Sequence, residues 1–193
     1  MKVLGIYGSV KRPSRTARLV DAILEGIARG ADVEIDAAPV LFRALRADQL
    51  DAAGRAIIDT VEAADVLVVG SPVYRASYTG ALKHLFDLVD FRALQRRRVV
   101  LAATGGSPLH GLMLEHEFRP LFGFFGAVTI PTTVYAVEAD FTEYTLSNPA
   151  VEARIERAIF ELFDLSPAIS RIDATTGAGD RILRIVSDAI AAN

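Results

Sequence analysis

The residues best suited to bind a ligand lie between Gly8 and Thr16, where an apolar run ends and a helical pattern begins. The unpaired N–H groups and the dipole at the first turn of a helix attract an anion. Side chains that can donate hydrogen bonds surround that turn, at Ser9, Lys11, Arg12, Ser14, Arg15 and Thr16. Arg15 can grip a phosphate through two N–H groups at once. We therefore expect an anion-binding loop, and the alternative is a solvated loop whose Ser or Thr only caps the helix.

The glycine spacing of residues 8–16 indicates which kind of phosphate the loop would bind. The pyrophosphate of a dinucleotide requires the pattern G-x-G-x-x-G, which lets the backbone approach. Nucleoside triphosphatases carry G-x-x-x-x-G-K-[ST] instead. The loop contains neither pattern. It therefore favours a terminal phosphate monoester.

Two further loops follow apolar strand patterns and suit a flat ring. The loop of residues 71–83 contains Pro72, Val73, Tyr74, Arg75 and Tyr78, and the loop of residues 104–110 contains Thr104, Gly105, Gly106, Ser107 and His110. In an open α/β sheet, the loops at the carboxyl ends of the strands share the edge where ligands bind. Residues 72–74 can lie along a ring, and the backbone N–H groups of residues 104–106 can reach its polar rim. Either loop alone would be an ordinary Pro- or Gly-containing turn.

The elements that must position these loops alternate between strand and helix patterns. We expect strands at residues 2–7, 32–38, 66–70, 99–103 and, as one last strand region, 127–131 with 134–137. We expect helices at residues 16–28, 45–63, 78–89, 108–125 and 151–163. This alternation predicts an α/β fold, in which a parallel sheet carries helices on both faces.

The tail of the chain departs from this alternation after residue 163. Residues 173–179 are typical of a loop, and residues 180–192 show one apolar helical face that needs a partner in the domain or in another subunit. The sequence therefore predicts a domain at residues 1–163 and an extension at residues 164–193 that ends in a helix.

Composition excludes several functions. The chain has 193 residues, no Cys and a net charge of −3. The absence of Cys excludes disulfides, thiolate nucleophiles and iron–sulfur clusters, and the charge argues against a general nucleic-acid binder. The three His residues are too scattered to predict a metal site. Because no run approaches the length of a signal peptide or membrane helix, we expect a cytoplasmic protein.

Pro120 interrupts the helix expected at residues 108–125. An interior Pro loses one hydrogen bond and clashes with the carbonyl four residues earlier, that of His116, at a cost of about 3 kcal/mol. A one-residue π-bulge around His116–Pro120 would relieve the clash, and such bulges are common at functional sites. The alternative is a simple kink with His116 exposed to solvent. His110 can reach a ligand from the third loop or be a surface residue, and Tyr78 can belong to the core or to an interface.

The three loops together resemble the NADPH-dependent FMN reductase family of flavodoxin-like proteins. The resemblance covers roughly residues 1–163 and rests on the motifs G-S-x(4)-S-x-T, S-P-V-Y-x-x-S-Y-T-G-A-L-K and T-G-G-S. It is greatest to the FMN reductases of bacterial alkanesulfonate and methanesulfonate use, which supply reduced FMN to a partner monooxygenase. It implies a flavodoxin-like three-layer sandwich, a five-stranded parallel sheet of order 2-1-3-4-5, and homodimers or homotetramers.

The resemblance also assigns residues to the cofactor. The phosphate of FMN would be held by Ser9, Ser14, Arg15 and Thr16. The ring would lie between Pro72, Val73, Tyr74 and Arg75 on one side and Thr104, Gly105, Gly106 and Ser107 on the other. In the sulfonate-related reductases, the position equivalent to His116 belongs to a π-helix at a tetramer interface near the active site.

The implied reaction is hydride transfer from NAD(P)H to FMN. The two cofactors carry this chemistry, so we assign no catalytic acid or base. The alternatives are a quinone, azo-dye or chromate reductase that retains FMN, and a flavodoxin-type electron carrier without nicotinamide activity.

Overall fold

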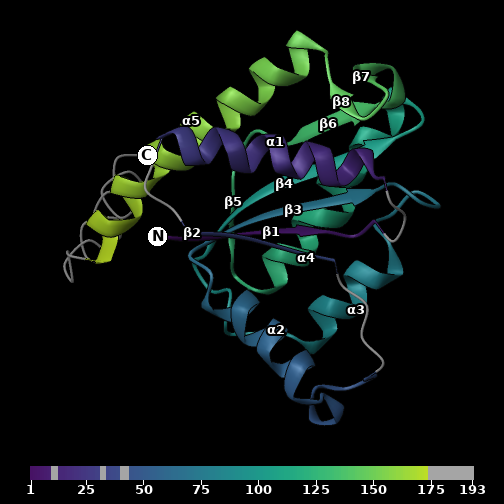
Figure 1. The fold of residues 1–193 in the computed structure, drawn as a ribbon. Coiled ribbons are helices and arrows are strands. Elements are labelled where there is room, and N and C mark those ends of the chain that lie inside the picture. Colours follow the sequence, from purple (N-terminus) through teal and green to yellow (C-terminus); the bar gives the residue numbers. More distant parts are fainter. Residues whose placement is uncertain (10–12, 31–33, 40–43, 174–193) are drawn as a thin grey trace, which may run out of the picture.

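The computed structural model describes residues 1–9, 13–30, 34–39 and 44–173 (Figure 1). Its centre is a parallel sheet of β1 (Lys2–Tyr7), β2 (Glu34–Pro39), β3 (Val66–Pro72), β4 (Arg98–Gly105), β5 (Val128–Thr129) and β6 (Val134–Val137). The hydrogen-bonded order is β2-β1-β3-β4-β5, and β6 also pairs with β4. Because β5 pairs with the start of β4 and β6 with its end, these two short strands share the last position of the sheet.

Helices cover both faces of the sheet, as the alternating pattern predicts. On one face lie α1 (Arg15–Gly30) and α5 (Pro149–Asp173); on the other lie α2 (Ala52–Ala63), α3 (Gly80–Leu88) and α4 (Arg119–Phe124) (Figure 1). β3 is buried along its whole length, and its successive side chains enter the two cores in turn. Val66 and Val68 face α1 and α5, whereas Leu67 and Val69 face the other three helices. The predicted α/β class is confirmed.

Two helices begin later than the sequence pattern predicts, because a polar side chain caps each of them. α2 starts at Ala52 rather than at residue 45, since the Asp51 carboxylate accepts the Gly54 N–H at 2.7 Å. A short 3₁₀ turn, Ala47–Gln49, precedes it. α3 starts at Gly80 rather than at residue 78, since the Thr79 hydroxyl accepts a backbone N–H from its first turn. In both cases the apolar periodicity begins before the helix does, and the capping residue determines where the helix starts.

The single helix expected at residues 108–125 consists of three segments with different windings. A 3₁₀ helix, Pro108–Leu112, is followed by a π-helix, Leu114–Phe118, and then by α4. The Arg119 N–H donates to the carbonyl of Leu114, five residues earlier. The prediction of one uniform helix was therefore wrong. Of the two alternatives for Pro120, a π-bulge or a simple kink, the structure contains a π-helical turn, which ends two residues before Pro120. His116 lies on that turn and is exposed.

A small antiparallel hairpin, which the sequence pattern did not reveal, lies between the sheet and α5. Its strands are β7 (Phe141–Thr142) and β8 (Thr145–Leu146). They are too short for an alternating pattern to emerge, and the turn between them contains Glu143 at a φ of +57°. Phe141 and Leu146 pack into the core under α1 and α5, so the hairpin is anchored to that face.

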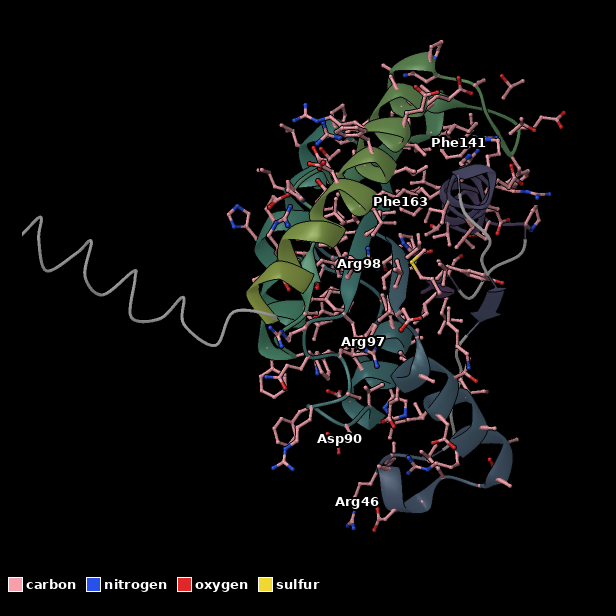
Figure 2. The ribbon with its side chains drawn as sticks, turned by 90° about the vertical axis from the view of Figure 1, so that its left-hand side faces the viewer. Arg46, Asp90, Arg97, Arg98, Phe141 and Phe163 are labelled. Atoms are coloured by element: carbon pink, nitrogen blue, oxygen red, sulfur yellow. The ribbon has the colours of Figure 1, made fainter. Side chains whose placement is uncertain are left out.

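α5 continues to Asp173, past the predicted domain boundary at residue 163. The Arg98 guanidinium, beside α5 in Figure 2, donates to the carbonyl of Leu162 at 3.2 Å and ties the helix to the start of β4. The helix expected at residues 180–192, and residues 174–179 of the expected loop, lie outside the described residues. Within the described part of the chain, no helix has the length and apolar character needed to cross a membrane.

Candidate active site

A cavity of about 340 Å³ lies where β1, β3 and β4 end. It is lined by all three predicted loops and by a segment after β6: Ser9, Pro13, Ser14, Arg15, Thr16, Pro72, Val73, Tyr74, Thr104, Gly105, Gly106, Glu138 and Tyr144. Of the residues assigned to FMN by resemblance, Arg75 and Ser107 are outside this lining. Lys11 and Arg12 lie outside the described residues. The parallel topology thus brings together side chains that are separated by more than a hundred positions in the sequence.

Ser14, one of the lining residues, caps the first turn of α1. Its hydroxyl oxygen accepts the Ala17 N–H at 3.2 Å, and its carbonyl accepts the Arg18 N–H at 3.1 Å. A hydroxyl that accepts one hydrogen bond still has a proton to donate. Capping and anion binding, which were alternatives at the sequence level, are therefore compatible at this residue.

Buried hydroxyl groups join the three loops to one another. The Thr16 and Thr104 hydroxyls share a hydrogen bond of 2.6 Å, which links the first loop to the third. The Thr79 hydroxyl donates to the carbonyl of Gly8 at 2.8 Å, and the Thr79 N–H donates to the Ser71 hydroxyl at 3.0 Å. Sequence reasoning missed Thr79 and Ser71, and the Thr directly before the start of α3 was the available signal.

Gly8 is required by this close approach. A Cβ atom at Gly8 would lie 2.5 Å from the Thr79 hydroxyl oxygen and 3.0 Å from the Cβ of Leu82. Any larger residue would therefore push the first loop away from the start of α3. The glycine of the G-S motif serves packing between two loops.

Tyr74 is held at the rim of the cavity by a tight turn. Its N–H donates to the carbonyl of Ser77 at 2.9 Å, and the Ser77 N–H donates back at 3.1 Å. The two residues between them, Arg75 and Ala76, have φ values of +53° and +66°. Positive φ at both central positions is the pattern of a type I′ turn, which normally carries Asn-Gly. Each non-glycine residue there costs about 1–2 kcal/mol. Arg75 is exposed at the tip of this turn.

The π-helix contacts this turn and the residue that follows it. The Ser77 hydroxyl donates to the Glu117 carboxylate at 3.1 Å. The ring of Tyr78 stacks on Phe118, with centroids 5.1 Å apart and planes 12° apart. Burial raises the pKa of the Tyr78 hydroxyl. Tyr78 is therefore a packing contact between the second loop and the π-helix, and it does not line the cavity. Exposed His116 lies on the turn that makes these contacts.

Gly105 and Gly106 have opposite surroundings. A Cβ at Gly105 would lie 2.3 Å from the Tyr135 hydroxyl oxygen and 3.3 Å from the His110 Cβ. The same Tyr135 hydroxyl donates to the carbonyl of Ser107 at 2.6 Å, and burial raises its pKa. A Cβ at Gly106 would meet nothing within 4 Å. Gly105 therefore serves packing, whereas Gly106 leaves open space beside the cavity. His110 is exposed and packs behind Gly105, outside the cavity lining.

Arg15 meets two residues that sequence reasoning missed. Its Nη2 atom lies 2.6 Å from a carboxylate oxygen of Glu138, and its guanidinium carbon lies 5.4 Å from the centroid of the Tyr144 ring. Both partners follow β6, more than 120 positions along the chain, so no local spacing could have revealed them. Within the described part of the chain, the Arg15 Nε is buried and has no hydrogen-bond partner.

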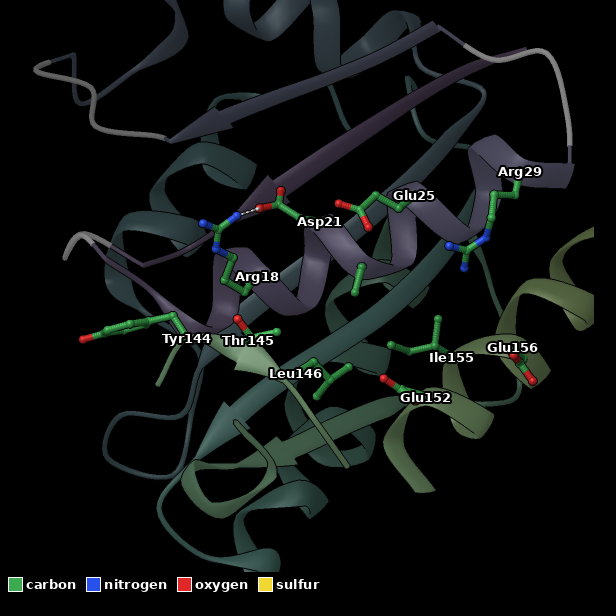
Figure 3. Close-up of a pocket in the computed structure, with 11 residues that line it drawn as sticks. Arg18, Asp21, Glu25, Arg29, Tyr144, Thr145, Leu146, Glu152, Ile155 and Glu156 are labelled. Atoms are coloured by element: carbon green, nitrogen blue, oxygen red, sulfur yellow. Dashed lines mark ion pairs between the residues drawn. The ribbon is translucent and has the colours of Figure 1, made fainter. Parts of the chain in front are cut away.

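A second cavity, of about 510 Å³, lies between α1, the β7–β8 hairpin and α5 (Figure 3). Its charged residues are Arg18, Arg29, Asp21, Glu25, Glu152 and Glu156. Arg18 pairs with Asp21 at 3.8 Å, the pair drawn as a dashed line in Figure 3. Because four carboxylates outnumber two guanidinium groups, the lining opposes binding of a phosphate. No group of three metal-ligating side chains gathers here or elsewhere among the described residues.

The match to a protein-family model shows which family the chain belongs to. The model of the NADPH-dependent FMN reductases matches residues 1–142. The chain belongs to this family. It is therefore an oxidoreductase of a family that uses FMN and NAD(P)H, and the family predicted from the three loop motifs is confirmed.

Several relatives align with most of this chain. It is 46% identical over 164 residues to the NADH-dependent FMN reductase SfnF of Pseudomonas fluorescens (strain Pf0-1), an alignment that spans 82% of this chain and 88% of that protein. It is 45% identical over 163 residues to an FMN reductase (NADPH) of Pseudomonas aeruginosa, spanning 81% and 88%. The apo crystal structure of the NADH:FMN oxidoreductase EMOB superimposes with a TM-score of 0.76 at 30% identity, covering 83% of this chain and 87% of that one.

Proposed function

We propose that this protein is an NAD(P)H-dependent FMN reductase whose active site is the cavity between the three loops. The observation that carries the proposal is the meeting of the α1 N-terminus with the ends of β3 and β4 in one cavity. Such a place offers an anion site and a lining for a flat ring within one small volume.

The residues present fit FMN in two respects. Among the described residues, the buried Arg15 Nε has no hydrogen-bond partner; it lines the same cavity as Ser14 and Thr16, and the phosphate of FMN would supply the acceptor. The open space at Gly106 would let the ring come close to the backbone of the third loop. We therefore assign the phosphate to Ser9, Ser14, Arg15 and Thr16. The ring is assigned to residues 72–74 and 104–106.

Bound FMN supplies the hydride chemistry, since it accepts a hydride from a nicotinamide and passes the electrons on. The chain's own residues bind and orient. The strained turn at residues 74–77 fixes Tyr74 at the rim, where the residue is 49% exposed and can meet a second planar molecule. The Thr16–Thr104 hydrogen bond holds the first and third loops at a fixed separation.

We also propose how the product is used. The reduced FMN leaves for a partner monooxygenase of a sulfonate-utilising pathway, in the cytoplasm. The support is the identity of 43–46% with relatives named FMN reductases. The protein assembles as a dimer or tetramer through the surface that includes His116. The support is that Leu109 and Leu112, in the 3₁₀ helix that precedes the π-helix, are 79% and 60% exposed.

Oxidation of NADH and of NADPH by the purified protein, each with and without added FMN, tests the proposal. We expect oxidation that depends on added FMN. Absence of oxidation under every flavin condition, together with tight FMN binding, would indicate an electron carrier instead. Oxidation without added FMN that saturates with a quinone would indicate a reductase that retains its flavin.

Size-exclusion chromatography with light scattering tests the assembly. We expect a dimer or tetramer for the native chain and a smaller species for His116→Ala. A monomeric native protein would contradict the proposed interface, and so would an unchanged His116→Ala assembly.

A further inference from the structure

The charges of the described residues that line the active-site cavity cancel. Among the described lining residues, Arg15 is the only cationic side chain and Glu138 the only anionic one. The two are joined by the contact of 2.6 Å between Nη2 and Oε1. The Glu138 side chain is 74% exposed and that of Arg15 is 33% exposed. The cavity is proposed to bind a phosphate dianion, and Arg15 is the one described cation in its lining that could neutralise that charge. In the free protein, Arg15 is already paired with the Glu138 carboxylate.

The segment after β6 presents Glu138 in a fixed position. Glu138 begins a 3₁₀ turn, Glu138–Asp140, whose last residue is braced on both sides. The Asp140 carboxylate accepts the Val137 N–H at 2.7 Å and the Asn148 amide at 2.5 Å. The Asp140 carbonyl accepts the Ser147 N–H at 2.9 Å. The position of Glu138 thus follows from the backbone of the β6–β7 connection.

Two opposite effects of Glu138 on phosphate binding are conceivable from this geometry. The carboxylate can orient Arg15 toward the phosphate, or it can compete with the phosphate for Arg15 and repel it. Orientation contributes little when the pair is as exposed as this one, because solvent weakens the ion pair. Competition is stronger, since a phosphate monoester carries a charge of about −1.5 to −2 at pH 7 and enters the cavity that Glu138 lines.

We propose that Glu138 sets a low affinity for FMN by holding Arg15, which exchanges between Glu138 in the free enzyme and the flavin phosphate in the complex. This inference rests on the proposed function, because it takes the cavity to be the FMN site. Glu138 thereby acts through Arg15 as a positioning residue, and its effect is to favour release of FMN over retention. In the free enzyme the Arg15 guanidinium also lies over the Tyr144 ring.

Titration of FMN into the full-length protein, followed by flavin fluorescence, tests the role of Glu138. For Glu138→Gln we expect FMN to bind about two- to fivefold more tightly, the range that loss of an exposed ion pair corresponds to. Riboflavin, which lacks the phosphate, should bind native and Glu138→Gln protein equally. The matched control is Glu143→Gln, which removes an exposed carboxylate from the neighbouring hairpin turn and should leave both affinities unchanged. Unchanged or weaker FMN binding by Glu138→Gln would overturn the proposal, and equal tightening of riboflavin would do so too.

The background variant Arg15→Gln separates exchange from simple repulsion. If Glu138 acts by holding Arg15, then Glu138→Gln should no longer tighten FMN binding once Arg15 is replaced. Persistence of the full tightening would overturn the exchange. A native protein that binds no FMN would contradict the proposed function itself. Native FMN binding without an effect of Glu138→Gln would contradict the role of Glu138 alone.

Discussion

Alanine should have different effects at two adjacent glycines, Gly105 and Gly106: the first substitution should lower stability, and the second should weaken FMN binding. In Gly105→Ala, the new methyl group would lie 2.3 Å from the Tyr135 hydroxyl oxygen, so that ring must move. Its movement breaks the 2.6 Å hydrogen bond to the carbonyl of Ser107. In Gly106→Ala, the methyl group meets no atom within 4 Å and occupies space beside the cavity instead.

The sizes of the two effects follow from these contacts. For Gly105→Ala, a lost hydrogen bond of about 1 kcal/mol and overpacking of about 1–3 kcal/mol are partly offset by the smaller entropy of the unfolded chain. We expect the free energy of unfolding to fall by about 1–3 kcal/mol. Each kcal/mol corresponds to a decrease of about 2–4 °C in Tm. For Gly106→Ala, we expect stability to stay the same or rise by up to about 1 kcal/mol, while FMN binds more weakly.

Urea unfolding followed by circular dichroism and titration with FMN measure both quantities on the same samples. The background variant Tyr135→Phe removes the atom that the methyl group would meet. Gly105→Ala should therefore cost at least about 0.5 kcal/mol less in that background, as a coupling between contacting residues. Equal costs in the two backgrounds would refute the steric explanation. A loss of stability in Gly106→Ala as large as that in Gly105→Ala would refute the distinction between the glycines.

The parts of the structure that the sequence predicted are those governed by local rules. The continuous apolar run that includes Val68 must be covered on both faces, which identifies β3 and the layered α/β fold. Once three parallel strands are expected, their end loops must share an edge, so the meeting of Ser14, Tyr74 and Gly106 around one cavity follows from topology. The interior Pro120 predicted either a π-bulge or a simple kink, and the structure contains a π-helix just before it.

The parts that could not be predicted depend on contacts between distant positions. Glu138 and Tyr144 reach Arg15 across more than 120 residues, from a turn and a hairpin that carry no periodic pattern. Similarly, Asp51 and Thr79 set helix starts through single hydrogen bonds that apolar periodicity does not register. The location of the cavity could therefore be predicted from the sequence, and the pairing of Arg15 with Glu138 could not.

Three further substitutions test other parts of the structure. Gly8→Ala brings a methyl group to 2.5 Å from the Thr79 hydroxyl, so thermal unfolding should show a loss of about 1–3 kcal/mol and FMN titration a weaker complex. Ala76→Gly relieves backbone strain at a φ of +66° and should raise stability by about 0.5–1 kcal/mol in urea unfolding, with FMN binding retained. Burial raises the pKa of Glu161, but hydrogen bonds from the Thr132 hydroxyl and N–H outweigh it and leave the pKa below its usual value. Its stabilising contribution is therefore complete above about pH 4.3 and is lost as the pH falls through the lowered pKa, so Glu161→Gln should lose stability at neutral pH and show a shallower acid-side decline. If the stability of the native protein and that of Glu161→Gln fell equally as the pH is lowered, this assignment would be contradicted.

The structure of the protein with FMN bound tests the proposed active site most directly. We expect the phosphate within hydrogen-bonding distance of Ser14 and Thr16 at the start of α1, with the ring along residues 72–74 and close to Gly106. FMN bound instead in the cavity between α1 and α5, or at a surface that none of the three loops lines, would contradict the assignment of the active site.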